Sequence, residues 1–205
     1  MKHRNDEPHS PLQRTRIASA AARLMAEDGI ADFDLAKRKA ARSLGLPETA
    51  ELPDSAEVEA ELRVYQRLFQ GSDHDAELDY LRRKAIELMA VLSPFRPYLT
   101  GAVLDGTAGA HAEIDLQLFV DSSKEVEIFL LNQQIDYHPS TPRTERAEAV
   151  LTLYLDDVVC NLIIYAPQQE RVAFKTRSGK VRPRARLDAV KSLLMAPAPA
   201  GTTKE

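Results

Sequence analysis

Two acidic residues, Glu113 and Asp115, stand one residue apart at the start of an apolar run. From Glu113 to Val120 polar and apolar residues alternate, which is the period of a strand. That period directs both carboxylates to the same face of the strand. Two neighbouring carboxylates repel each other unless a cation lies between them. Because oxygen ligands suit Mg²⁺ (or Mn²⁺), the sequence predicts a divalent-metal site at Glu113 and Asp115.

A glycine-containing segment precedes this strand and reads Gly-Ala-Val-Leu-Asp-Gly over residues 101–106. The backbone N–H groups of such a segment can hold a phosphate oxygen. A metal ion beside a phosphate cradle is what phosphoryl transfer requires. The candidate phosphate-binding residues are Gly101, Ala102, Gly106 and Thr107.

The spacing of these residues resembles that of the polymerase-β-like nucleotidyltransferase superfamily. The motif of that superfamily has Gly-Ser at the end of a strand and a second Gly five residues after the first. An acidic-x-Asp triplet follows seven residues later. Gly101, Gly106, Glu113 and Asp115 fall at these positions, and the resemblance covers residues 85 to 165. It implies transfer of a nucleotidyl group from a nucleoside triphosphate to an acceptor, with Mg²⁺ and a third carboxylate on a later strand.

Asn161 stands at the position of that third carboxylate. An Asn oxygen can bind a metal ion, but it carries no charge and is a poor general base. Asp157 lies on the same face, about 13 Å away in an extended strand, and reaches the site only if the turn folds back. Two further departures are Ala102, where the family often has a phosphate-binding Ser, and Ala112 before the first carboxylate.

These observations leave two hypotheses for this site. In the first, the protein is a metal-dependent nucleotidyltransferase whose catalytic set is Glu113, Asp115 and Asn161. In the second, it is a non-catalytic regulatory protein that binds a nucleotide or a partner on the same fold. The expected partners are a nucleoside triphosphate and an acceptor, which could be a small molecule, a protein or an RNA.

A basic stretch from Arg171 to Arg186 contains seven Lys or Arg residues. Arg177-Ser-Gly-Lys180 within it is typical of an exposed hairpin turn. The stretch is either a solvated strip or a contact for phosphate groups. In the second case Lys180 is a candidate nucleotide-binding residue.

The hydrophobic periodicity predicts an α+β protein, with an N-terminal helical region followed by a small nucleotidyltransferase-like mixed sheet flanked by helices. The expected divisions are a disordered tail (1–14), a helical region (15–95), the sheet domain (96–195) and a second disordered tail (196–205). Asp54 with Glu57, and Ser122 with Glu125, resemble capping boxes. Expected helices cover about 15–28, 34–44, a segment after Asp54, one ending at Ser93-Pro94, 123–134 and 187–195. Expected strands cover 99–104, 113–120, 149–155 and 158–165, with a Pro-rich loop at 138–143.

The first two helices support a third hypothesis, because the first resembles the opening helix of bacterial helix-turn-helix repressors. The second helix is basic on one side through Lys37, Arg38, Lys39 and Arg42. An acidic, Pro-containing loop follows where a recognition helix is needed. Specific DNA binding is therefore not expected.

Composition narrows the class of protein. The chain has 205 residues and a formal net charge of -4, so no overall positive field attracts nucleic acid. The single cysteine, Cys160, lies in an apolar run and is expected to be a buried small side chain. No apolar stretch has the length of a membrane span, and residues 1–16 lack the apolar core of a signal peptide. We therefore expect a cytoplasmic protein without a membrane partner.

Overall fold

The computed structural model describes residues 11–30, 32–47, 50–69, 71–109, 112–142, 144–175 and 181–195. The chain divides into two compact units, one of residues up to Asp75 and one of 76–108 and 112–205. The expected tail 196–205 lies outside the described residues. The expected tail 1–14 is wrong for its last four residues, because the first helix already begins at Pro11. Proline fits the first turn of a helix, where its missing N–H group has no partner to lose.

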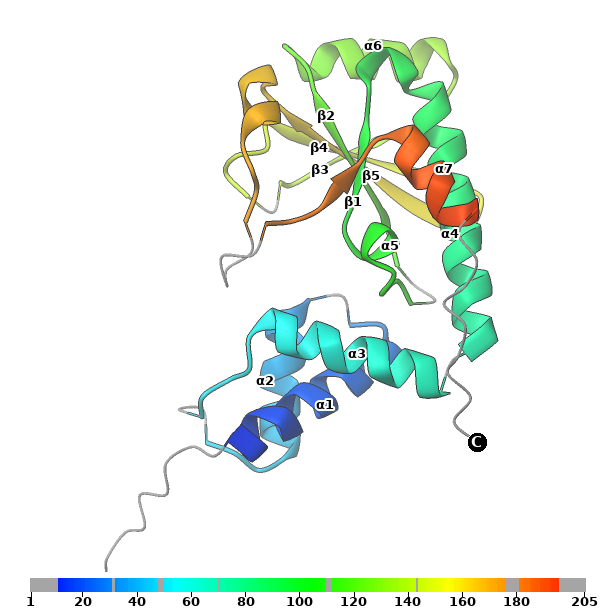
Figure 1. Ribbon diagram of the computed structural model, residues 1–205. Helices are drawn as coiled ribbons and strands as arrows, with labels where there is room; N and C mark the ends of the chain where they lie inside the picture. The colour runs from blue at the N-terminus through cyan, green and yellow to red at the C-terminus, as the bar shows by residue number, and fades with distance from the viewer. Residues whose placement is uncertain are drawn as a thin grey trace, which may run out of the picture. The chain divides into compact units, whose positions relative to one another are not determined.

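The N-terminal unit contains α1 (Pro11–Asp28), α2 (Phe33–Ser43) and α3 (Ser55–Phe69) (Figure 1). Its small core is rich in alanine, which lets the helices approach closely. The fully or almost fully buried side chains are those of Ile17, Ala18, Ala21, Ala22, Ala36, Ala40, Ala41, Val58 and Leu62.

Side-chain caps determine where two of these helices begin. Asp32 Oδ1 accepts hydrogen bonds from the backbone N of Asp34 and Leu35, at 2.8 and 3.0 Å. The capping box expected before α3 is confirmed. The N of Asp54 donates to Glu57 Oε2 (2.6 Å), and the N of Glu57 donates to Asp54 Oδ1 (2.8 Å). These bonds satisfy N–H groups that have no partner within the helix.

The expected basic side of α2 needs one correction, at Lys37. Its side chain is buried, with its Nζ 2.8 Å from Asp34 Oδ1 and 3.4 Å from Ser55 Oγ. Arg38, Lys39 and Arg42 are exposed. Lys37 therefore joins α2 to the start of α3 and does not contribute to an exposed basic surface.

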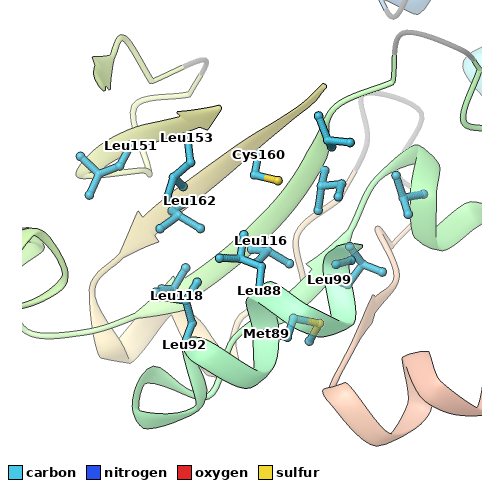
Figure 2. Packing of buried hydrophobic residues seen from close by; sticks show 14 of the residues in the cluster. Leu88, Met89, Leu92, Leu99, Leu116, Leu118, Leu151, Leu153, Cys160 and Leu162 are labelled. Atoms are coloured by element: carbon cyan, nitrogen blue, oxygen red, sulfur yellow. The ribbon is translucent and has the colours of Figure 1, made fainter. Parts of the chain in front are cut away.

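The long helix α4 (Gly71–Val91) packs against the sheet of the second unit. Its predicted apolar stripe is buried, as seen for Leu78, Leu81, Ala85 and Leu88. Figure 2 shows side chains of α4 meeting those of the sheet. Because of this packing, the boundary between the two compact units falls at residues 75–76 of the chain, whereas the sequence suggested a boundary at 95–96.

A six-stranded mixed sheet forms the second unit, which confirms the α+β class. Its order is β3-β4-β5-β2-β1-β6, and only the β2–β5 pair is parallel among the described strands. The strands are β1 (Tyr98–Thr100), β2 (Ile114–Phe119), β3 (His138–Ser140), β4 (Ala149–Leu155), β5 (Val158–Tyr165) and β6 (Arg184–Ala185). The remaining elements are the 3₁₀ turns η1 (Ser93–Phe95) and η2 (Pro167–Arg171) and the helices α5 (Ala102–Asp105), α6 (Ser123–Asn132) and α7 (Leu187–Met195).

Three parts of the sheet differ from the expectation. The strand expected at 99–104 ends at Thr100, because Gly101 turns the chain with a φ of +76° and the one-turn helix α5 follows. The expected loop 138–143 begins with β3, an edge strand in which Pro139 can be accommodated. The basic stretch contains β6, which pairs with β1.

The two faces of the sheet differ in character. Helices α4, α6 and α7 contribute to one hydrophobic core with the apolar side chains of β1, β2, β4 and β5. Figure 2 shows this core around Leu116, Leu118, Cys160 and Leu162. The alternate residues of the same strands point to the opposite face, and these include the acidic and amide groups singled out by the sequence. Throughout the described ranges, none of the helices combines the length and apolarity that crossing a membrane requires.

Candidate functional site

The side chain of Asn161 joins the two acidic residues. Its Nδ2 donates hydrogen bonds to Glu113 Oε2 at 2.7 Å and to Asp115 Oδ1 at 3.1 Å. Both carboxylates therefore point to the same side of β2, as the period of the strand predicts. Hydrogen bonds from one amide offset part of the repulsion between the two carboxylates.

The register of the sheet brings this group together. β2 and β5 run parallel, and Asp115 pairs with Asn161. On the other side of β5, the antiparallel β4 places Thr152 opposite Asn161. Neighbouring strands lie about 4.8 Å apart, so side chains in such a row are within hydrogen-bonding reach. The cluster is thus built from residues that are up to 48 positions apart in the chain.

Gly101 approaches the site through its backbone. A Cβ atom built on this residue would lie 3.2 Å from Asp115 Oδ2, which is tighter than nearly all real Cβ contacts. Its φ of +76° is also a conformation that glycine adopts at low cost. Both properties explain the glycine, and they place bare backbone beside one of the two carboxylates.

The other residues of the glycine segment lie in different surroundings. Gly106 ends α5 with a φ of +78°, and its nearest neighbours belong to α4: Arg82 Nη2 and Leu78 Cδ2 would be 3.7 and 3.8 Å from an added Cβ. Thr107 is 9% exposed, and its backbone N donates to Ala102 O at 3.0 Å. The structure therefore brings Gly101 to Asp115, while Gly106 packs toward α4. Lys180 lies outside the described residues.

Asp157 does not take the place of the third carboxylate. Its Oδ1 accepts a hydrogen bond from the Tyr80 hydroxyl of α4 at 2.6 Å. This bond lowers the pKa of Asp157 and raises that of Tyr80. Its neighbour Asp156 has a φ of +55° and accepts from Lys84 Nζ at 2.8 Å. The turn between β4 and β5 is thus held to α4.

Two further polar residues extend the cluster toward the sheet edge, and the sequence analysis did not single them out. Thr152 Oγ1 donates to Asn161 Oδ1 at 3.0 Å, and Ser140 Oγ lies 2.8 Å from Thr152 Oγ1. The position of Thr152 opposite Asn161 could have been predicted from the sequence. A two-residue turn at 156–157 fixes the hairpin register, and that register sets Thr152 against Asn161.

The opposite end of the same face holds an arginine and aromatic cluster. The Arg184 guanidinium lies over the rings of Tyr98 (4.6 Å) and Phe119 (5.3 Å), and that of Arg186 lies 3.6 Å from the Tyr98 ring centre. Arg186 also pairs with Glu170, Nη2 to Oε1, at 2.6 Å. These two arginines of the basic stretch are therefore engaged within the protein and do not form a solvated strip.

A pocket of about 370 Å³ lies beside this second cluster. Its lining includes Phe95, Phe119, Glu170 and Arg186 but none of the three residues of the carboxylate and amide group. Between the two ends, Gln117 is 4% exposed and its Oε1 has no hydrogen-bond partner. The carboxylate group and this pocket are thus at opposite ends of β2.

Cys160 is buried as expected, with no exposed surface. Burial, with a smaller contribution from the negative charge of Asp115, raises the pKa of its thiol to about 12. The residue is therefore a neutral part of the core and not a nucleophile.

The donor set of the candidate site consists of two carboxylates and one amide. Within the ranges that the structure describes, no group of three or more His, Cys, Asp or Glu side chains could hold a metal ion. Comparison with protein-family models found no match, and comparisons with curated proteins and solved structures found none either. The function is therefore argued from the geometry of the site.

Proposed function

We propose that the sheet unit carries a nucleotidyltransferase-type site centred on Glu113 and Asp115. The observation that supports it is the convergence of these carboxylates on Asn161, with the backbone of Gly101 against Asp115. The spacing that resembles the polymerase-β-like superfamily predicted that Gly101, Glu113, Asp115 and Asn161 lie together, whereas its second glycine, Gly106, lies against α4. The substrate would be a nucleoside triphosphate, and the acceptor a hydroxyl group of a small molecule, a protein or an RNA.

The residues present fit one Mg²⁺ (or Mn²⁺) ion. Mg²⁺ is commonly bound in proteins through one or two carboxylates, with substrate phosphates and water as the other ligands. Glu113 and Asp115 supply the carboxylates, and Asn161 can supply its amide oxygen after rotation of the amide group. When bound, the ion would neutralise negative charge on the phosphates and on the leaving pyrophosphate.

The chain's own residues would orient the reactants. The backbone at Gly101 would lie along the phosphates, because Gly101 has no side chain to block a close approach, and Ala102 beside it carries only a methyl group. The acceptor oxygen would bond to the α-phosphorus, and the bond from that phosphorus to pyrophosphate would break. The hydroxyl proton would pass to water, since the neutral Asn161 cannot serve as a base. In this proposal the protein acts in the cytoplasm, where nucleoside triphosphates are available.

Label transfer tests this proposal. The purified chain is incubated with each α-labelled nucleoside triphosphate and Mg²⁺ or Mn²⁺, with and without cell lysate as a source of acceptor. We expect label on an acceptor with the wild-type protein and none with Asp115→Asn. Equal transfer by both proteins would contradict the assignment of the site.

A second candidate function is supported by the orientation of Asn161. Its Nδ2 group donates to both carboxylates, so the amide presents hydrogen-bond donors on the side where a cation would bind. A protein with this arrangement could bind a nucleotide or a partner without turnover. Asn161→Asp distinguishes the two functions: label transfer by wild type supports the enzyme. Transfer gained only in the variant supports a binding protein derived from an enzyme.

A further inference from the structure

A row of hydrogen-bonded side chains links the edge strand β3 to the candidate cation site. It runs from Ser140 Oγ to Thr152 Oγ1 (2.8 Å), then from Thr152 to Asn161 Oδ1 (3.0 Å). The amide Nδ2 continues it to Glu113 and Asp115. Thr152 and Asn161 are 7% and 9% exposed, whereas Ser140 is exposed. The row thus joins solvent at the sheet edge to the carboxylate pair.

Thr152 determines which end of the Asn161 amide faces the carboxylates. Because its hydroxyl donates to Oδ1, the Nδ2 group must point toward Glu113 and Asp115. In this orientation the partially positive N–H groups occupy the side on which a cation would sit. An amide can bind a divalent cation only through its oxygen. Cation binding with the help of Asn161 therefore requires the amide to turn over.

The hydroxyl groups of the row permit that reversal. A threonine hydroxyl both donates and accepts, so Thr152 Oγ1 can accept from Nδ2 after the amide has turned. Its proton can then be donated to Ser140 Oγ, since either atom of that pair can be the donor. Every buried group in the row keeps a partner in both orientations, which avoids the cost of an unsatisfied polar atom.

We infer that Thr152 is a positioning residue for the cation site, because it sets the orientation of the Asn161 amide. This inference rests on the proposed function, because it assumes a divalent cation at Glu113 and Asp115. It assigns the second orientation to the metal-bound protein, with Oδ1 toward the cation and Nδ2 toward Thr152.

The test measures Mn²⁺ affinity of the full chain by electron paramagnetic resonance, without nucleotide. In Thr152→Val the orientation found in the structure loses the donor to Oδ1, whereas the reversed orientation loses the acceptor of an Nδ2 N–H group. Orphaned buried N–H groups are tolerated less than orphaned carbonyl oxygens. We therefore expect Thr152→Val to weaken Mn²⁺ binding about tenfold, which corresponds to roughly 1.4 kcal/mol. Thr152→Ser keeps the hydroxyl and should bind Mn²⁺ like wild type.

A double-mutant cycle separates positioning from a general structural effect. In an Asn161→Ala background there is no amide to orient, so Thr152→Val should leave the Mn²⁺ affinity unchanged. A Thr152→Val effect of equal size in both backgrounds would overturn the inference. So would wild-type affinity in Thr152→Val. In either case the proposed function would survive, because the wild-type site still binds the ion.

A second measurement applies even if Thr152→Val fails to fold. The side-chain NH₂ signals of Asn161 are assigned in ¹⁵N-labelled wild type by comparison with Asn161→Asp, and Mg²⁺ is added. Both signals should shift as the amide leaves the carboxylates for Thr152. Mg²⁺ binding that leaves these signals in place would overturn the inference alone. Absence of any Mg²⁺ or Mn²⁺ binding by wild type would contradict the cation site and this inference together.

Discussion

The two ends of the polar sheet face hold their charged groups in different ways. At the start of β2, two carboxylates share one neutral amide donor, Asn161. At the end of β2, Arg184 and Arg186 stack on aromatic rings, and Arg186 also pairs with Glu170. Charges at the second end are matched by opposite charges and ring faces, so that end stabilises the fold. At the first end, the Asn161 amide donates to both carboxylates, and a cation could take the place of its N–H groups.

This difference agrees with the position of the glycine. Gly101 has no side chain, which lets the Asp115 carboxylate lie close to the backbone at the first end. At the second end there is a pocket of about 370 Å³, and two of the charged side chains that line it, Arg186 and Glu170, are paired with each other. We therefore expect the carboxylate end to exchange its hydrogen-bond donor for a cation, and the arginine and aromatic end to keep its contacts.

The largest expected effect is that of Asp115→Asn on label transfer. Loss of a carboxylate that holds the cation should lower transfer at least about 100-fold, because electrostatic stabilisation at such sites contributes several kcal/mol. Asp121→Asn is the matched control, since Asp121 is an exposed acid just beyond the other end of β2. Transfer should be normal in this control. A similar loss in both variants would indicate a general charge effect and would contradict a specific role for the carboxylate end of β2.

A smaller effect is expected when a methyl group is added at Gly101. In Gly101→Ala the backbone strain at a φ of +76° and the 3.2 Å approach to Asp115 act together. We expect a loss of about 1–3 kcal/mol in the free energy of unfolding, measured with urea. Gly106→Ala should cost less, because Gly106 has left-handed helical angles (φ +78°, ψ 22°) and an added Cβ would meet only ordinary contacts at 3.7 Å or more. Equal losses in the two variants would show that the approach to Asp115 costs nothing.

At the second end, Arg184→Ala should affect stability without affecting the cation site. The variant loses the stacking over Tyr98 and Phe119 and the hydrogen bond to the Glu170 carbonyl. The expected loss is about 1–2 kcal/mol in urea unfolding. Mn²⁺ affinity should stay within about twofold of wild type, which is roughly 0.4 kcal/mol. Strongly weakened Mn²⁺ binding would mean that the two ends work as one site.

The smallest effect concerns Cys160, which lies on the core face behind Asn161. Its pKa is raised to about 12 in the folded protein, mainly by burial, so the unfolded chain releases the thiol proton at lower pH. Between about pH 9 and 12 the unfolded state therefore binds fewer protons, and stability should fall as pH rises. Cys160→Ala, measured in parallel, should remove this part of the slope.

Reactivity gives a second check on Cys160. It is the only cysteine of the chain, so the uptake of a thiol reagent reports on this residue alone. At pH 8 the folded protein should react only as fast as it unfolds. Rapid labelling of the folded protein would contradict the buried, neutral thiol.

Local patterns predicted much of the sheet unit. The ranges expected for the two strands of the hairpin and for the last helix match β4, β5 and α7, because apolar periodicity and turn residues define them. The same period placed Glu113 and Asp115 on one side of β2. Cys160 was predicted as buried because it lies in an apolar strand.

Other features depend on contacts between distant segments and could not be predicted in this way. The pairing of Asp115 with Asn161 follows from the parallel register of β2 and β5, which no local pattern determines. The pairing of β6 with β1 and the stacking of Arg184 on Tyr98 bring a polar stretch onto the sheet, where the sequence left a solvated strip and a phosphate contact as alternatives. Gly106 illustrates the same limit, since its spacing suggested a phosphate contact and its neighbours are side chains of α4.

Mn²⁺ binding in the presence of a non-hydrolysable nucleoside triphosphate is the direct test of whether Glu113 and Asp115 bind a divalent cation. Electron paramagnetic resonance counts bound and free Mn²⁺ for wild type, Asp115→Asn and the Asp121→Asn control. We expect wild type and the control to bind one Mn²⁺ ion per chain, and to bind it more tightly when the nucleotide is present. Asp115→Asn should bind Mn²⁺ on the order of 100-fold more weakly. Equal Mn²⁺ binding by Asp115→Asn and wild type would contradict the assignment of Glu113 and Asp115 as the cation site.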